Sequence, residues 1–230
     1  MDADSGTERF HRYIDSFAEA SEDIMRGQYP DLRSRPWYDT ADFPFAVYLE
    51  ENYDAIRAEL LALDPCGFRQ AHNRIDRSGD WDVIFLYERG YRHDENCNVC
   101  PVVMTGIDNY SAMRTVAGLA YLSRLRPGAH IRPHSGPTNM RLRCHLGITV
   151  PQGDCAIRVG EEIRRWQEGG CIVFDDYFEH EAWNHTKNDR TVLVVDLWHP
   201  ELSAAEVALL NGLHEYAYSY AGELNRYWAR

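Results

Sequence analysis

The sequence predicts a mainly β protein in which antiparallel strands form a barrel or a double sheet with helices at its two ends. Strand-like segments follow one another from about residue 81, and turn signals such as Pro127-Gly128 separate them. Helical periodicity dominates the first 65 residues and returns after Ser203. The strands do not alternate regularly with helices, so a parallel sheet is not expected, and a functional site is expected in the barrel mouth.

The N-terminal part contains two expected helices. Apolar residues recur at helical spacing within residues 7–25, and again over 49–63 in steps of four, three, four and three. Residues 28–44 are rich in proline and turn residues, which indicates an extended connection between the two helices. Pro65 and Gly67 end the second helix.

Five β-rich segments follow, and their ranges are 83–87, 118–125, 141–150, 171–174 and 191–198. A short helix is expected near residues 108–116. Ser203 and Glu206 have the spacing of a capping box, which predicts that a C-terminal helix begins there.

The segment RLRCHLGITV, residues 141–150, alternates in polarity. Leucine, cysteine, isoleucine and valine point to one side, whereas Arg141, Arg143 and His145 share the other. The polar side either faces solvent or lines a ligand cavity inside the barrel, where an arginine would bind a carboxylate through its planar fork. Arg190, just before the last strand, is a further candidate for such a clamp.

Composition excludes some classes of function. The chain has 230 residues and a formal net charge of −12, which argues against general nucleic-acid binding and against binding to an anionic membrane surface. The sequence contains no apolar run of about 18 residues and no apolar leader, so we expect no membrane segment and a cytoplasmic protein. The partner that this composition allows is a small molecule or a peptide.

Six cysteines are spread along the chain, too sparsely for a disulfide scaffold. Cys97 and Cys100 form a lone C-x-x-C pair, which is half of a zinc site without a second half. We therefore expect a loop dithiol, or a disulfide under oxidising conditions. Cys144 and Cys171 lie in strand-like segments and are expected to be core residues.

Half of the ten histidines lie between residues 130 and 185. Imidazole is a ligand for iron, zinc, copper and nickel, although a lone histidine is usually structural. The segment IRPHSGPTNM places Gly136 where an acidic metal ligand would follow His134, and FDDYFEHEAWNH adds His180, which Asp175, Asp176 and Glu179 precede. Spacing alone leaves both a metal site and a set of structural histidines open.

Long segments of the chain, taken together, resemble the aspartyl/asparaginyl β-hydroxylase family. They are LRPGAHIRPHSGPTNMRLRCHLGITVP, IRVGEEIRRWQEGG, FDDYFEHEAWNHT and RTVLVVDLWHPELS, with YPDLRSRPWYDTADFPF and LEENYDAIRAELLAL upstream. The resemblance covers roughly residues 29–202 and implies a double-stranded β-helix, or jelly roll, of the cupin-like type. From the order of helices and strands, we expect a single domain, 1–230, that consists of helical support (1–80), the catalytic core (81–202) and a C-terminal helix (203–230).

The resemblance also implies an iron site. By motif position, His134 and His180 would be the Fe(II) ligands, and the family carries a small residue where other 2-oxoglutarate oxygenases have an acidic third ligand. Gly136 matches that pattern. It leaves a position on iron that water or a halide could take.

Five further residues acquire roles from the resemblance. His145 and Arg190 would bind 2-oxoglutarate with help from Ser123. Arg143 would hold the carboxylate of the substrate side chain, and Arg141 would support it.

The implied reaction is hydroxylation of an unactivated C–H bond with O2 as co-substrate, while 2-oxoglutarate becomes succinate. The expected target is the β-carbon of an aspartyl- or asparaginyl-like amino acid, free, carrier-bound or in a peptide. Two alternatives stay open: an iron and 2-oxoglutarate halogenase or other tailoring enzyme of natural-product biosynthesis, and a non-enzymatic jelly-roll binding module. The sequence does not indicate an oligomeric state.

Overall fold

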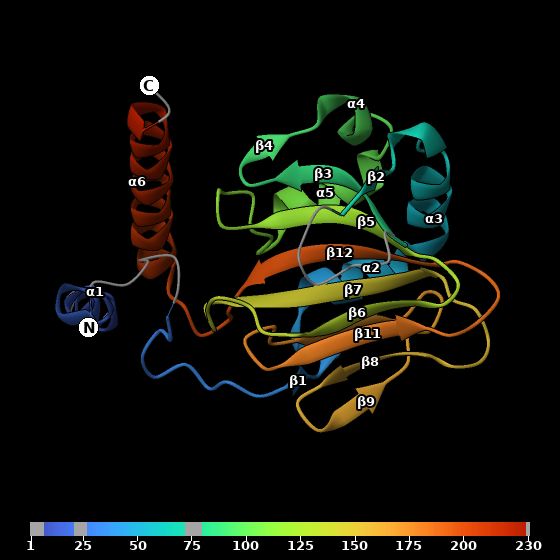
Figure 1. Cartoon of the computed structure of the whole chain (residues 1–230), viewed down its shortest axis with the longest axis horizontal. Helices are drawn as coiled ribbons and strands as arrows, with labels where there is room; N and C mark the ends of the chain where they lie inside the picture. Colours follow the sequence, from blue (N-terminus) through green and yellow to red (C-terminus); the bar gives the residue numbers. More distant parts are fainter. Residues whose placement is uncertain (1–6, 21–26, 72–79, 229–230) are drawn as a thin grey trace.

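Two antiparallel sheets face each other in the computed structural model, which describes residues 7–20, 27–71 and 80–228 (Figure 1). The larger sheet has eight strands, in the order β1 (Trp37–Tyr38), β10 (Cys171–Phe174), β7 (Arg141–Thr149), β12 (Arg190–Trp198), β5 (Leu119–Leu125), β3 (Trp81–Glu88) and β2 (Arg69–Gln70), with β4 (Tyr91–Arg92) paired to β3. The smaller sheet has four, in the order β6 (Ala129–His134), β11 (His180–Asn184), β8 (Cys155–Val159) and β9 (Glu162–Arg164). This arrangement confirms the mainly β, double-stranded β-helix fold.

Helices flank the sheets at both ends of the chain and also interrupt the strand-rich part. They are α1 (Glu8–Ala20), α2 (Pro44–Glu51), α3 (Tyr53–Leu61), α4 (Asp94–Cys97), α5 (Pro101–Asn109) and α6 (Ala204–Trp228). The single helix expected over 49–63 was wrong in detail, since α2 ends before Asn52 and α3 begins after it. The helix expected at 108–116 lies earlier, because Pro101 occupies a first-turn position of α5, where its missing N–H costs nothing.

The alternation of β7 places its two faces in different environments. Its apolar residues are fully buried in a cluster that joins the large sheet to α2, α3 and α5. Its other face looks toward the small sheet, where His145 is 8% exposed and the Arg143 side chain 14% exposed. The alternative in which these polar residues point to solvent is therefore wrong, because helices cover the apolar face.

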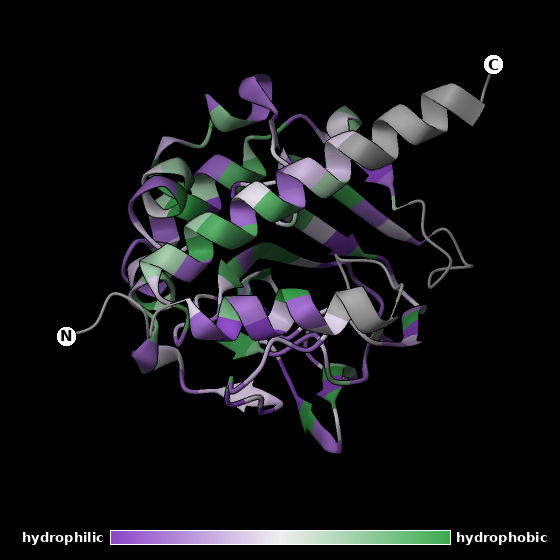
Figure 2. Cartoon of the chain, turned by 90° about the vertical axis from the view of Figure 1, so that its left-hand side faces the viewer, coloured by the Kyte–Doolittle hydropathy of each residue, from purple (hydrophilic) through white to green (hydrophobic). Residues whose placement is uncertain are grey.

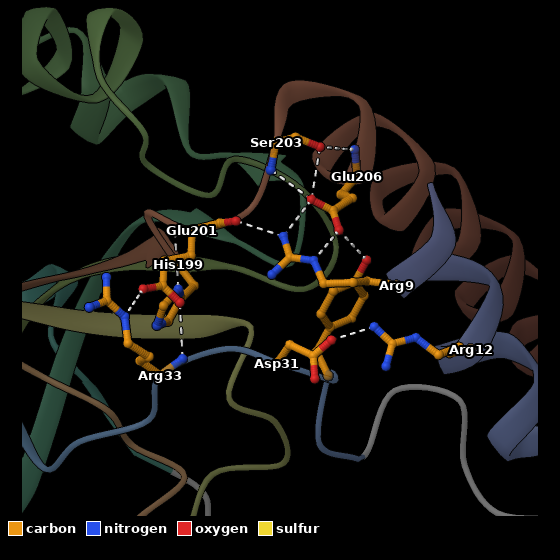
Figure 3. A network of polar contacts seen from close by, with 9 residues as sticks. Arg9, Arg12, Asp31, Arg33, His199, Glu201, Ser203 and Glu206 are labelled. Carbon is orange, nitrogen blue, oxygen red and sulfur yellow. Dashed lines mark hydrogen bonds and ion pairs between the residues drawn. The ribbon is translucent and has the colours of Figure 1, made fainter. Parts of the chain in front are cut away.

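The terminal helices α1 and α6 lie at the end of the molecule where β12 ends (Figures 1 and 2). The expected capping box is present: the Ser203 hydroxyl accepts from the Glu206 amide at 3.2 Å, and the Glu206 carboxylate accepts from the Ser203 amide at 2.8 Å. That buried carboxylate also accepts two hydrogen bonds of 2.8 Å from Arg9 of α1 (Figure 3). This pairing fixes α6 against α1. None of the described helices has the length and apolar composition needed to cross a membrane.

A loop dithiol was expected at Cys97 and Cys100, but these two residues do not form an accessible one. Both are free thiols, 1% and 0% exposed, within the cluster under α2 and α5. Burial raises the pKa of both, to about 12 for Cys100, which disfavours the reactive thiolate. Cys144 is fully buried and Cys171 partly buried, so the expectation of two core cysteines is confirmed for Cys144.

Candidate active site

His134 and His180 meet at the open end of the small sheet. His134 ends β6, His180 begins β11, and the two residues are direct partners in the ladder, with ring centroids 4.1 Å apart. Nδ1 of His134 lies 2.7 Å from the Arg132 carbonyl, and Nδ1 of His180 lies 2.9 Å from the Phe178 carbonyl. A carbonyl can only accept, so each Nδ1 donates and each Nε2 keeps a free lone pair, which is the tautomer that binds a metal.

The environment of this pair keeps both rings uncharged. Burial lowers the pKa of His134, and burial together with the neighbouring His134 ring lowers the pKa of His180 to about 4. Neutral imidazole is the form that ligates metals, so no proton has to leave before a cation binds near neutral pH.

Gly136 lies two residues after His134, and the space next to it is filled by Asp176. A Cβ built on Gly136 would lie 2.5 Å from the Asp176 Cγ, closer than real side chains approach. Asp176 is 1% exposed, and its Oδ1 has no hydrogen-bond partner within the described chain. Among the described residues, no group of three His, Cys, Asp or Glu side chains is placed to hold a metal ion. Asp176 therefore occupies the position of a side chain at residue 136 without completing a three-ligand set.

A cavity between the sheets contains hydrogen-bond donors that lack acceptors. His145 and Arg190 line it together with His134 and His180. The Trp166 indole N–H donates to His145 Nδ1 at 3.3 Å, so the proton of His145 is on Nε2, which is buried without a partner in the described structure. This donor is available to a ligand oxygen.

Arg190 is the most unusual charge in this cavity. It is 2% exposed, its guanidinium carbon lies 4.6 Å from the centroid of the Trp166 ring, and its Nε has no partner within the described chain. Burial lowers its pKa to about 10, because no carboxylate offsets the desolvation. A buried cation without an anion is costly, and it is satisfied by an anionic ligand. The Ser123 hydroxyl, which accepts from Trp81 at 3.0 Å, lines the same cavity with its own proton free to donate.

Arg141 and Arg143 lie next to this cavity, but their charges are paired. Arg141 donates to Asp176 at 2.7 Å, and Arg143 donates from Nε to Asp196 at 3.0 Å. Cross-contacts of 3.4 and 3.3 Å close a cluster of two cations and two carboxylates. Although burial opposes ionisation, Arg141 and Arg143 hold the pKa of Asp176 below its usual range.

The structure thus brings together all seven predicted site residues: His134, His180, Ser123, His145, Arg190, Arg143 and Arg141. Two other histidines of the same sequence cluster lie elsewhere, as His130 pairs with Glu181 at 2.8 Å and His185 with Asp154 at 2.9 Å on exposed surface.

Sequence reasoning missed three residues that shape this site. Asp196 shares a face of β12 with Arg190, and that alternation is the signal that could have found it. Trp166 lies in an irregular segment, and Trp81 precedes its expected strand by two residues, so neither carried a local signal.

Several known proteins are similar to this chain. The family described as aspartyl/asparaginyl beta-hydroxylase matches residues 50–200. An ornithine lipid ester-linked acyl 2-hydroxylase from Rhizobium tropici is 37% identical over 229 residues, which cover 92% of this chain and 77% of that protein. The aspartyl/asparaginyl beta-hydroxylase of Homo sapiens is 36% identical over 179 residues, which cover 75% of this chain but 24% of that protein. A solved prolyl-4-hydroxylase from Pseudomonas putida has a TM-score of 0.43 and 13% identity, covering 67% of this chain and 98% of that one. The chain belongs to the aspartyl/asparaginyl beta-hydroxylase family of enzymes.

Proposed function

We propose that the protein is an Fe(II)- and 2-oxoglutarate-dependent oxygenase that hydroxylates an unactivated C–H bond. One observation carries the proposal: two neutral histidines with free Nε2 atoms lie beside a cavity in which a buried arginine lacks an anion. A metal needs the first feature and a dicarboxylate needs the second.

The residues present fit both groups. His134 and His180 would hold iron through Nε2, and their bonds to Arg132 and Phe178 orient the rings. When bound, iron with O2 and 2-oxoglutarate supplies the oxidation that places one oxygen atom in a C–H bond and yields succinate and CO2.

The cavity residues would hold 2-oxoglutarate by its two ends. Arg190 binds one carboxylate, assisted by the Ser123 hydroxyl, and His145 donates from Nε2 to the other. The indole of Trp166 orients His145 and stacks on Arg190, which fixes both donors before the ligand arrives. The apolar walls of the cavity, such as Phe174, exclude water from the reacting atoms.

Asp176 favours hydroxylation over halogenation. A halide would need the space beside Gly136, and the Asp176 carboxylate fills that space. The negative charge of this carboxylate disfavours a second anion there. We therefore retain hydroxylation as the proposed outcome.

The first candidate substrate is an aspartyl- or asparaginyl-like group, free, carrier-bound or in a peptide. Arg143 is the residue that would hold its carboxylate, since it lines the cavity that contains the two histidines. Arg143 is already paired with Asp196, so the substrate must share or displace that contact, while Arg141 keeps Asp176 in place.

The second candidate is an acyl chain, as the name of the Rhizobium tropici relative suggests for that protein. The observation that favours it is a cleft of about 430 Å³, here called the α6 cleft, which shares Arg143 with the cavity. Half of its lining residues are apolar, and they are Met113, Val116, Ala117, Leu119, Pro137 and Met140. Two methionines make such a wall adaptable to a flexible chain.

The test is incubation of the protein with Fe(II), 2-oxoglutarate and each substrate class under air. We expect succinate in step with a product heavier by one oxygen atom. No coupled turnover with aspartyl peptides, aspartate, asparagine or acyl lipids would contradict the proposal. A chlorinated product in chloride buffer would replace hydroxylation with halogenation.

A further inference from the structure

The turn between β3 and β4 holds an arginine in a conformation that suits other residues better. Glu88 pairs with Tyr91, so Arg89 and Gly90 form a two-residue hairpin loop, and their φ angles are 51° and 82°. A loop with both residues at positive φ favours asparagine, aspartate or glycine at its first position. Arginine at this position is therefore strained. An arginine at such an unfavourable position points to a role for its side chain.

That side chain lies between two clefts. Arg89 lines the α6 cleft and also a second cleft of about 280 Å³, and Leu119 is the other residue that both share. The second cleft shares Trp81 and Tyr121 with the cavity between the sheets. Arg89 is thus placed where two clefts meet, and each of these clefts shares at least one lining residue with the cavity that contains the two histidines.

Arg89 is also the unpaired cation of the α6 cleft among the described residues. Arg141 and Arg143 are neutralised by Asp176 and Asp196. His214 of α6 is 2% exposed, and burial lowers its pKa to about 4, so it carries no charge near neutral pH. Among the described residues that line this cleft, Arg89 is therefore the cation whose charge is left to attract an anionic group.

The rest of the α6 cleft is suited to a hydrocarbon chain. Its lining contains Arg89 and Arg143 besides the apolar residues, and α6 contributes His214 and Tyr218. The Arg9–Glu206 pair holds α6 in place at its first turn (Figure 3). A ligand that matches this lining therefore combines an apolar chain with one anionic group that Arg89 binds.

From this arrangement we propose that Arg89 anchors the anionic head group of an acyl amphiphile, whose chain lies in the α6 cleft and reaches the two histidines past Arg143. This inference rests on the proposed function and selects its second candidate substrate class. The shared chemistry of the head group is a carboxylate or a phosphate oxygen. Arg89 is a specificity-determining residue remote from the reacting carbon.

The experiment is calorimetric titration under argon of protein loaded with Fe(II) and 2-oxoglutarate, so that the 2-oxoglutarate site is filled. The probes are laurate and dodecyl phosphate, which share a chain, 1-dodecanol, which lacks the charge, and a tripeptide with a central aspartate. The variants are Arg89→Asn, which removes the charge and suits the turn, Arg89→Lys, which keeps the charge, and Arg57→Gln of α3 as a charge-matched control outside the clefts.

We expect laurate or dodecyl phosphate to bind the wild type, Arg89→Lys to stay within about twofold, and Arg89→Asn to bind at least about fivefold more weakly. Arg57→Gln should match the wild type, and the melting temperature of Arg89→Asn should not fall, which separates charge loss from misfolding. The inference is overturned if Arg89→Asn binds both anions normally, if 1-dodecanol binds as tightly as they do, or if only the tripeptide binds. Absence of 2-oxoglutarate binding by the wild type would contradict the proposed function, and the comparison of Arg89→Asn with the wild type would still decide the inference on Arg89.

Discussion

Two neighbouring regions of this molecule treat buried charge in opposite ways. In the cavity between the sheets, Arg190 is 2% exposed and has no anion among the described residues. On the adjacent strand β7, Arg141 and Arg143 are paired with Asp176 and Asp196 at 2.7 and 3.0 Å. The first region is incomplete without a ligand, whereas the second is already neutral. The comparison separates a buried cation that lacks an anion from buried cations whose charges are already paired.

The largest expected effect is loss of a metal ligand. His180→Ala removes one of two predicted iron ligands, so turnover should fall by well over about 100-fold, since loss of a mere neighbour of a ligand already costs 10–100-fold. The rate of succinate formation measures this turnover. His130→Ala, which removes an exposed histidine paired with Glu181, is the control and should keep wild-type turnover. Equal turnover in the two variants would contradict the assignment.

The next largest effect is expected from a change in the paired cluster of Arg141, Arg143, Asp176 and Asp196. Arg143→Met leaves Asp196 buried at 0% exposure without its 3.0 Å partner. Breaking a buried ion pair from one side destabilises a protein by about 3–5 kcal/mol. Chemical denaturation should show this loss in protein without cofactors. Unchanged stability would mean that the cluster is not a supporting element.

Arg190→Met should stabilise the folded protein, whereas Arg143→Met should destabilise it. Removing an uncompensated buried cation is expected to raise the melting temperature by a few degrees, about 2–4 °C for each kcal/mol gained in a chain of this size. The same change should raise the KM for 2-oxoglutarate by about 30–100-fold, because the charge that binds one carboxylate is lost. A lower melting temperature together with an unchanged KM would refute the contrast with Arg143.

The smallest expected effect concerns pH. Burial lowers the pKa of His214 to about 4, below the ~6.5 of an unfolded histidine. As pH falls from 7 to 5, the unfolded chain gains a proton that folded His214 does not take, so folding stability is lost. In the His214→Phe variant, the loss of folding stability between pH 7 and pH 5 should be smaller by about 1–2 kcal/mol. Chemical denaturation at the two pH values measures this difference. The wild type and the variant losing stability in parallel would argue against the neutral, buried ring.

Much of the fold was predictable because the strands are regular. The period of two in β7 divided its residues into two faces correctly, and the capping box at Ser203 located the start of α6. Which face of β7 points inward was not decidable from periodicity, since it depends on α2, α3 and α5 covering the apolar side. The break between α2 and α3 at Asn52 was not predicted, because the apolar spacing continues across it.

The candidate site was predictable in its residues but not in its charge balance. Long motifs indicated the two histidines and the arginines, whereas the pairing of Arg141 with Asp176 and of Arg143 with Asp196 joins residues 35 and 53 positions apart. Only the folded sheets bring those groups together. In the same way, Gly136 predicts a missing ligand, but the sequence does not show that Asp176 fills the space beside it.

The most direct test of the central claim is the anaerobic stoichiometry of Fe(II) binding to the wild type, to His134→Ala/His180→Ala and to His130→Ala/His185→Ala. The account predicts one iron per chain in the wild type and in the second double variant, whose histidines lie in exposed pairs with Glu181 and Asp154. The first double variant should bind none. Full iron binding after loss of His134 and His180 would contradict the account.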